Sequence, residues 1–145
     1  MKKDQSFGIL ALQKNHDEWQ VFVIQQHQGH YCFPKGHPEP GEKPFDTAKR
    51  ELKEETGLEI KQKLKITPLS EHYHFRYETE KIQKTVTYFP CTVEGTPKLQ
   101  ESEILNGLWL SFEKVEETLT YPNSKKLFCD AKERLIKILD SLPQS

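Results

Sequence analysis

The most informative stretch of the chain is residues 36–58, GHPEPGEKPFDTAKRELKEETGL. Its Gly- and Pro-rich beginning predicts a loop that runs to Gly41. Pro44 suits the first turn of a helix, where its missing N–H is not needed, and Gly57 suits a left-handed cap at the end of that helix. The stretch therefore predicts a loop followed by a helix over residues 44–57.

Three glutamates share one face of this predicted helix. Glu51 and Glu55 are four residues apart and Glu51 and Glu54 three, spacings that bring helical side chains together. Like charges so close repel, and a hard divalent cation such as Mg²⁺ removes that repulsion because it binds oxygen ligands. A solvated acidic face is the alternative that the glutamates alone leave open. The opposite face is apolar and predicted to meet the core: Phe45, Ala48 and Leu52.

The spacing of the whole stretch resembles the Nudix box, Gly-x5-Glu-x7-Arg-Glu-hydrophobic-x-Glu-Glu-x-Gly-hydrophobic. The matching positions are Gly36, Glu42 and residues 50–58. The resemblance implies an α/β fold, the Nudix α/β/α sandwich with a mixed β-sheet between helices. It also implies a Mg²⁺-dependent hydrolase that cleaves a nucleoside diphosphate linked to another group. The chemistry agrees, since a polyanionic diphosphate must be neutralised before water attacks phosphorus.

The residues that precede and begin this motif make the resemblance specific to one group of Nudix hydrolases. HYCFPKGHPEPGE, residues 30–42, is similar to the corresponding run of asymmetric diadenosine tetraphosphate hydrolases. Tyr31 stands where that family has Trp, and Phe33 where its animal-type members have Pro, and both substitutions keep a bulky side chain. Irregular histidine spacing without a soft fourth ligand argues against a zinc site here.

Three side chains of this run are candidates for steadying phosphate oxygens: His30, Lys35 and His37. Lys35 lies between a proline and a glycine, so its backbone is constrained and its ammonium can be aimed at a ligand. A solvated loop lysine is the alternative. Gly36 allows the backbone to approach a ligand closely, and its carbonyl is a candidate metal ligand beside Glu51, Glu54 and Glu55.

A hairpin of residues 71–79 and 84–93 is where we expect the purine. Adenine stacks on aromatic rings, at roughly 1–3 kcal/mol per base. The spacing of Tyr77, Lys84 and Tyr88 resembles the dinucleoside tetraphosphate hydrolases. That resemblance implies that Tyr77 stacks on adenine and that Lys84 and Tyr88 contact phosphate. A half-buried strand aromatic is the alternative for Tyr77.

Two further site residues rest on the resemblance. Glu103 lies six residues before Trp109, where the family carries a glutamate, and this implies a metal ligand or a residue that positions water. Tyr121 lies where the family places a second adenine-stacking tyrosine. An ordinary solvated glutamate and a loop aromatic that covers the core are the alternatives.

The remaining segments predict strands and two further helices. Strands are expected over residues 6–13, 19–26, near 64–69, over 71–79, 84–93 and 107–111. A short helix is expected from Ser111 to about Leu119, and a last helix over 124–140, capped by Asn123 or Ser124. Residues 80–83 are expected to be a polar connection, and Pro90 predicts an edge strand or a bulge. The helices 44–57 and 124–140 are expected on opposite faces of the sheet.

Composition limits the classes of partner. The chain of 145 residues predicts one domain over 1–145, and its net charge of −1 offers no basic field for duplex nucleic acid or a membrane. The apolar run near the N-terminus is too short for a membrane span or a signal segment. Three cysteines without a CxxC pair (Cys32, Cys91 and Cys129) indicate a reducing compartment, so we expect the protein in the cytoplasm. We also expect it to be a monomer.

The resemblance therefore implies asymmetric hydrolysis of diadenosine tetraphosphate, a small-molecule dinucleoside polyphosphate, to ATP and AMP. The expected cofactor is Mg²⁺, with Mn²⁺ as the alternative. Arg50 is expected to orient a glutamate of the box, while the general base stays open among Glu51, Glu54, Glu55 and Glu103. Other Nudix substrates remain alternatives: RNA 5′ ends, oxidised nucleoside triphosphates and diphosphoinositol polyphosphates. A catalytically silent nucleotide sensor is the alternative outside enzymes.

Overall fold

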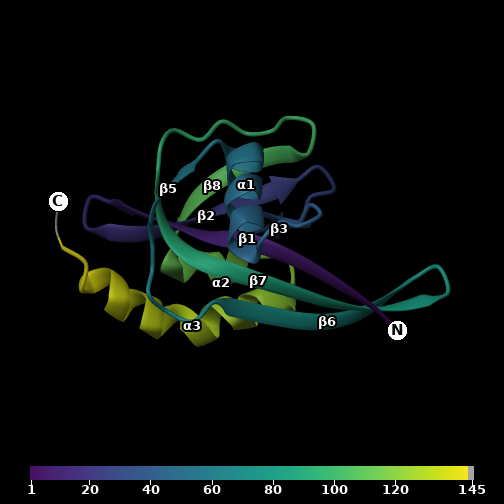
Figure 1. The fold of residues 1–145 in the computed structure, drawn as a ribbon. Coiled ribbons are helices and arrows are strands. Elements are labelled where there is room, and N and C mark those ends of the chain that lie inside the picture. Colours follow the sequence, from purple (N-terminus) through teal and green to yellow (C-terminus); the bar gives the residue numbers. More distant parts are fainter. Residues whose placement is uncertain (144–145) are drawn as a thin grey trace.

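A mixed β-sheet lies at the centre of the computed structural model, which describes residues 1–143 (Figure 1). The elements in chain order are β1 (Lys2–Asn15), β2 (Glu18–Gln26), β3 (Tyr31–Cys32), β4 (Lys35–Gly36), α1 (Pro44–Thr56), β5 (Glu59–Lys63), β6 (Leu69–Tyr77), β7 (Glu80–Glu94), β8 (Ile104–Ser111), α2 (Phe112–Thr118) and α3 (Pro122–Asp140). The strand order is β3-β2-β1-β7-β5, with β4 beside β1, β6 beside β7 and β8 beside β2. Only β1 and β7 run parallel among the described pairs, from Lys2↔Ile82 to Leu12↔Thr92.

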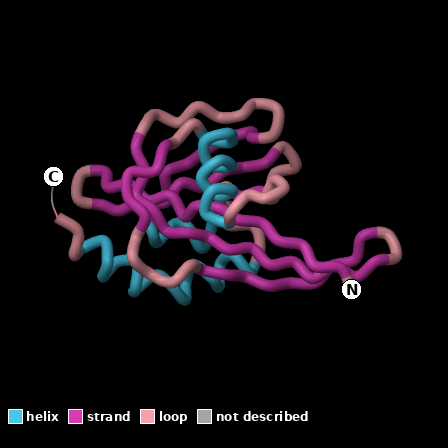
Figure 2. The backbone as a smooth tube through the Cα atoms, viewed as in Figure 1, coloured by secondary structure: helices cyan, strands magenta, loops and turns pink. Residues whose placement is uncertain are grey.

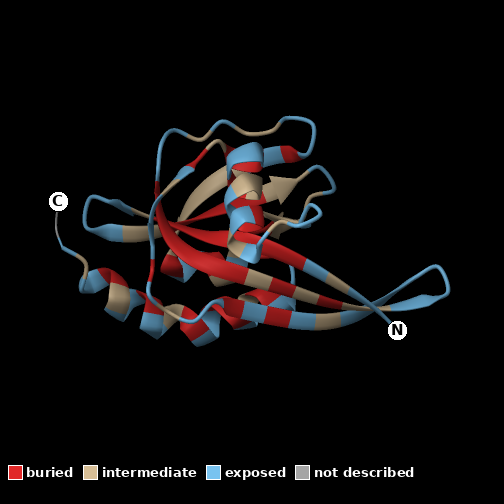
Figure 3. Ribbon diagram, in the orientation of Figure 1, coloured by how far each residue is buried: buried red, intermediate tan, exposed pale blue. Residues whose placement is uncertain are grey.

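Two apolar cores lie on the two faces of this sheet. Successive residues of β1 alternate between them, because strand side chains point to opposite faces: Ile9 belongs to one core and Leu10 to the other. Ala48 and Leu52 of α1 close the first core, and a stripe along α3 closes the second. Figure 1 shows α1 on one side of the sheet and α2 and α3 on the other, and Figure 3 shows that the strands between them are buried. The predicted α/β/α sandwich is confirmed.

The helix α1 begins and ends as its sequence predicts. Pro44 occupies its first turn, and Gly57 adopts φ 75° and donates its N–H to the carbonyl of Lys53. By contrast, α3 begins at Pro122 rather than at 124, and Tyr121 occupies the cap position without a side-chain hydrogen bond. The predicted caps Asn123 and Ser124 are therefore wrong, because Pro122 already supplies a backbone angle suited to the first helical position.

The strands of the 69–94 hairpin differ from the prediction. Residues 80–83 belong to β7 rather than to a connection, since the turn is completed at Glu78 and Thr79. The expected strand near 64–69 is also wrong: β5 ends at Lys63 and β6 begins at Leu69. Pro90 lies in an inner strand, where the partner of β7 changes from β6 to β5. The carbonyl of Pro90 accepts a hydrogen bond from the N–H of Leu64, so the missing N–H of Pro90 also faces the side of β5 and β6 rather than β1.

An arm extends from the sandwich. It consists of the β6–β7 hairpin and the start of β1, and Figure 2 shows these strands continuing beyond the helices toward the N-terminus. Much of its surface is exposed (Figure 3). Within residues 1–143, no helix combines the length and the apolar character needed to cross a membrane.

Candidate active site

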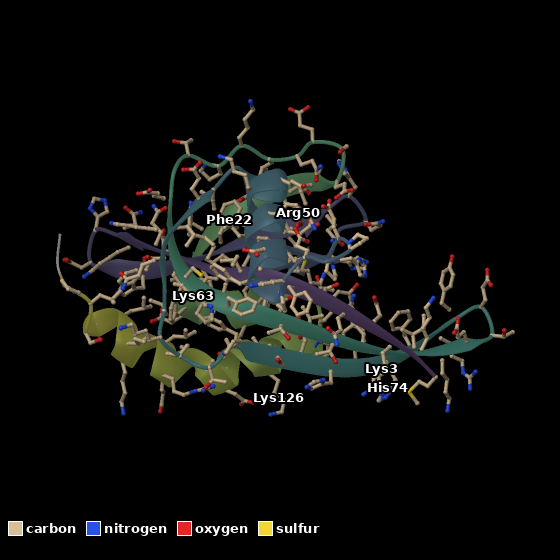
Figure 4. The ribbon with its side chains drawn as sticks, viewed as in Figure 1. Lys3, Phe22, Arg50, Lys63, His74 and Lys126 are labelled. Atoms are coloured by element: carbon tan, nitrogen blue, oxygen red, sulfur yellow. The ribbon has the colours of Figure 1, made fainter. Side chains whose placement is uncertain are left out.

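Arg50 connects the loop before α1 to the carboxylates on the helix. Its Nε and Nη2 donate to the two oxygens of Glu42 at 2.9 and 3.0 Å, and Nη1 donates to Oε1 of Glu51 at 2.9 Å. Nη1 also reaches Glu54 at 3.2 Å, and Nη2 reaches the carbonyl of His37 at 3.0 Å. Figure 4 shows Arg50 beside α1, where side-chain oxygens gather. One guanidinium thus fixes the positions of several site groups.

Glu42 fastens the Gly- and Pro-rich loop. Its Oε1 accepts hydrogen bonds from the hydroxyl of Thr47 at 2.7 Å and from the backbone N–H of Glu39 at 3.0 Å. The hydrogen bonds from Arg50, and then those from Glu39 and Thr47, lower the pKa of the Glu42 carboxyl to about 2. Glu42 is therefore ionised across the physiological range, which keeps the loop attached to α1.

Glu55 is the buried member of the carboxylate group. It is 5% exposed, and its Oε2 has no hydrogen-bond partner among residues 1–143. Burial, with a contribution from the charge of Glu51, raises the pKa of the Glu55 carboxyl to about 8, although the charge and backbone N–H of Lys35 act in the opposite direction. A buried oxygen without a partner is costly in a folded protein, so this position has the character of a ligand site.

Gly36 lies directly against Glu51. A Cβ at Gly36 would collide with the carboxylate of Glu51, so any other residue would displace one of them. Gly36 is held there by β4, which pairs with Phe7 and Gly8 of β1. The sheet therefore brings the backbone of residue 36 against the carboxylate face of α1, as the sequence predicts for a shared site.

The donor chemistry fits a hard divalent cation. Every candidate ligand is an oxygen, and Glu55 Oε2 has no hydrogen-bond partner in the described part of the chain. Glu51 and Glu54 point toward Arg50, and across the described part of the chain no three His, Cys, Asp or Glu side chains converge as a ready metal cluster. Burial raises the pKa of both Glu51 and Glu55, and the charge of Glu103, in the loop before β8, adds a smaller effect in the same direction. The oxygen donors and the clustered carboxylates thus fit a site for a divalent cation.

A pocket of about 510 Å³ adjoins this site. Aromatic side chains supply much of its wall: Tyr73 from β6, Tyr88 from β7 and Tyr121 before α3. The other lining residues are Gln26, Cys32, Lys35, Glu71, Pro122, Asn123 and Ser124. The ring of His30 lies 5.2 Å from the ring of Tyr121. Lys35 connects the carboxylate site with the pocket, since its backbone N–H donates to Glu55 and the residue lines the pocket.

Lys84 and His37 are brought together by an acid that the sequence analysis missed. The Nζ of the buried Lys84 lies 2.7 Å from Asp4 Oδ2, 2.6 Å from Ser6 Oγ and 3.2 Å from His37 Nε2. His37 also contacts Asp4, at 3.1 Å. Burial raises the pKa of the Asp4 carboxyl, but the hydrogen bonds with Lys84 and His37 outweigh it, and the pKa is lowered.

Tyr77 is not brought to this pocket. It ends β6 beside the hairpin turn, is 67% exposed and is absent from the pocket lining, whereas Tyr121 is 47% exposed and lines it. The cause is the arm, which carries the end of β6 away from the sandwich (Figure 1). Tyr88 differs again: its ring is buried edge-on against Phe33, and its hydroxyl has no partner among the described residues.

Several residues of the pocket and of the Lys84 cluster were not predicted from the sequence. Glu71 and Tyr73 lie on the same face of β6 as the buried Leu69, so strand alternation could have found them. Nothing local could have found Asp4 and Ser6, because they reach Lys84 through the parallel pairing of β1 with β7. Ser124, expected only as a cap, contacts Glu71 instead.

The family model and the curated relatives that match this chain indicate the same family. The family model described as NUDIX domain matches residues 2–131. "Nudix hydrolase 6" of Arabidopsis thaliana is 32% identical over 129 residues, which are 82% of this chain and 43% of the plant protein. "Bis(5'-nucleosyl)-tetraphosphatase [asymmetrical]" of Rattus norvegicus is 38% identical over 77 residues, 52% of this chain and 51% of the rat protein. The chain spans about half the length of these curated relatives.

Solved structures agree in fold. A C. elegans Ap4A hydrolase binary complex superimposes with a TM-score of 0.73 at 20% identity, covering 92% of this chain and 98% of that one. The NUDIX domain of Shewanella oneidensis NrtR, complexed with ADP ribose, gives 0.71 at 15% identity, with 93% and 90% covered. At these identities the likeness concerns the arrangement of the sheet and helices.

Proposed function

The chain belongs to the Nudix family of hydrolases, and on this basis we propose that it hydrolyses diadenosine tetraphosphate asymmetrically, to ATP and AMP, with Mg²⁺ as cofactor. One observation carries the proposal. Lys35 lies between the carboxylates of α1 and a pocket with three tyrosines, so a polyphosphate can extend from the carboxylates to a base in the pocket. The similarity to the rat tetraphosphatase supports this choice of substrate.

The proposed cation ligands are oxygens: Gly36, Glu51, Glu54, Glu55 and Glu103. When bound, Mg²⁺ supplies charge neutralisation on the polyphosphate and lowers the pKa of water. The protein supplies the geometry, since Arg50 sets the orientation of Glu51 and Glu54. The general base remains open among the four glutamates.

We place the substrate contacts around the tyrosine-lined pocket, which Lys35 separates from the carboxylates of α1. Lys35 and His30 are close to the pocket, and they would steady phosphate oxygens there. Lys84 and His37 form a second group of phosphate-binding candidates, which Asp4 holds in place. Tyr121 would stack on one adenine. Tyr77 could serve an adenine only if the arm bends toward the pocket, and Tyr88 would act through its hydroxyl.

The test is the reaction in water enriched in ¹⁸O. Diadenosine tetraphosphate and Mg²⁺ are incubated with the protein, and mass spectrometry identifies the products. ATP and AMP, with label in one of them, are expected, and the labelled product shows which phosphorus was attacked. Two ADP would overturn the asymmetric assignment.

Glu55→Gln should lower kcat by about 10² or more, as expected for charge-stabilising or acid–base groups. Glu59→Gln is the matched control, because Glu59 pairs with Lys53 on the exposed surface. Turnover of RNA 5′ ends or nucleoside triphosphates alone would retain the family chemistry and replace the substrate. Binding without turnover of any of these would indicate a nucleotide sensor.

A further inference from the structure

Glu71 is a buried carboxylate that the proposed reaction leaves unused. It is 7% exposed, lies on β6 and lines the tyrosine pocket. Its oxygens accept hydrogen bonds from Ser124 Oγ, at 3.1 Å to Oε2 and 3.4 Å to Oε1. Within residues 1–143 it forms no ion pair with a Lys, Arg or His. The charge of Lys35, which lines the same pocket, acts on Glu71 without a direct ion pair. Burying a carboxylate that no cation contacts directly is expensive, so an apolar residue would serve the fold better.

The hydroxyl of Tyr88, for which the resemblance implied a phosphate contact, is a second buried polar group in the same pocket. Tyr88 is 0% exposed, and no described residue hydrogen-bonds its hydroxyl. Its ring is fixed by the edge-on contact with Phe33, at 5.3 Å between centroids. Buried tyrosine hydroxyls ordinarily find a partner. The pocket therefore offers a strong acceptor, Glu71, and a fixed O–H that has no acceptor among residues 1–143.

The pocket walls suit a flat ring with a negative chain attached. Tyr73 and Tyr121 supply aromatic surface from two different elements, and Lys35 supplies positive charge on the side of the carboxylate site. An acceptor and a donor near one another are what the N6–N7 edge of adenine requires, since that edge presents an amino donor beside a ring acceptor. The same edge of guanine presents two acceptors, one of which would face the Glu71 carboxylate.

We propose that Glu71 determines base specificity by accepting a hydrogen bond from the exocyclic amine of adenine, while the Tyr88 hydroxyl donates to the adjacent ring nitrogen. The inference rests on the proposed function in one respect, that the tyrosine pocket holds the nucleoside end of the substrate. Ser124 is a positioning residue, since its hydroxyl orients the Glu71 carboxylate from the first turn of α3.

Calorimetric binding of AMP and of N6,N6-dimethyl-AMP tests this without turnover. The proteins are the wild type, Glu71→Met, Tyr88→Phe and the control His72→Gln, which alters an exposed neighbour on the other face of β6. Glu71→Met should weaken AMP by roughly tenfold or more and leave dimethyl-AMP, which lacks the donor, within about twofold. An equal loss for both ligands would overturn the proposal. So would Glu71-dependent binding of GMP that is tighter than that of AMP.

Kinetics separate this inference from the proposed function. With diadenosine tetraphosphate, Glu71→Met should raise KM and leave kcat within about twofold, because the base lies away from the reacting phosphorus. If the protein does not cleave diadenosine tetraphosphate but Glu71→Met still weakens AMP and not dimethyl-AMP, the proposed function is wrong. The role of Glu71 in adenine recognition then stands. If Glu71→Met does not fold, Tyr88→Phe decides, since it retains the ring: unchanged AMP binding in that variant would overturn the inference.

Discussion

The guanidinium of Arg50 holds the carboxylate of Glu42 by two parallel hydrogen bonds, Nε to Oε2 at 2.9 Å and Nη2 to Oε1 at 3.0 Å. The remaining nitrogen of the same group reaches Glu51 and Glu54. A loop and three glutamates of the Nudix box therefore depend on one planar cation.

Arg50→Lys should show this dependence. Lysine keeps the charge but cannot form the paired hydrogen bonds, so we expect the apparent Mg²⁺ affinity and kcat to fall by roughly ten- to a hundredfold. A Mg²⁺ titration of the initial rate measures both quantities. The control is Lys53→Arg on the exposed side of α1, which should behave as the wild type. Wild-type Mg²⁺ dependence in Arg50→Lys would contradict the role of the guanidinium.

Glu55 should make the metal-free protein less stable as pH rises. Its pKa is about 8 in the folded protein against an ordinary value of 4.5, so between these values the folded state holds a proton that the unfolded state has released. The free energy of unfolding should therefore decline from about pH 5 to about pH 8 and then level off, by a few kcal/mol in total. Urea unfolding in chelator measures the decline, which Glu55→Gln should reduce. An identical decline in the variant would show that Glu55 is not its source.

Gly36→Ala should damage the site more than the fold. The added Cβ meets the carboxylate of Glu51, and a displacement of about 1 Å in a catalytic group can cost on the order of 10² in rate. We expect kcat to fall at least tenfold, while the melting temperature changes little. Lys43→Ala in the same loop is the control, since its side chain makes no cap hydrogen bond. Full activity in Gly36→Ala would place the reacting groups away from Glu51.

Tyr121 and Tyr77 should differ in their effect on substrate binding. Tyr121 lines the pocket, so Tyr121→Ala should raise KM by roughly tenfold, in the range of base–aromatic stacking. Tyr77 lies at the end of the arm, and Tyr77→Ala should change KM by less than about twofold if the arm keeps its position. An effect of Tyr77→Ala as large as that of Tyr121→Ala would show that the arm closes over the bound nucleotide.

The three cysteines should react unequally. Cys129 on α3 is exposed, whereas Cys32 and Cys91 are buried. Burial raises the pKa of the Cys32 thiol, and it raises that of Cys91 to about 12, against a weaker opposing effect of Lys63. Titration of the native protein with Ellman's reagent near pH 8 should therefore modify one thiol rapidly, and none in Cys129→Ser. Rapid modification of Cys129→Ser would mean that the core around Cys32 or Cys91 opens readily.

Local features of the chain could be predicted because their cause is local. Pro44, Gly57 and the spacing of the glutamates define α1 and its carboxylate face within a few turns of helix, and the structure agrees. The strand ends were less predictable. Residues 80–83 are polar, yet they extend β7 because the arm pairs with β6 and with the start of β1.

The sequence by itself determined the family, the helix with its carboxylate face and the two-faced sheet, because periodic apolar positions and a closely spaced motif carry this information directly. Only the tertiary structure decided that Asp4 holds Lys84, that Glu71 and the buried Tyr88 hydroxyl share one pocket, and that Tyr77 lies outside it. These relationships depend on the register of β7 between a parallel and an antiparallel partner. Such pairing joins residues far apart in the chain, and no short-range pattern encodes it.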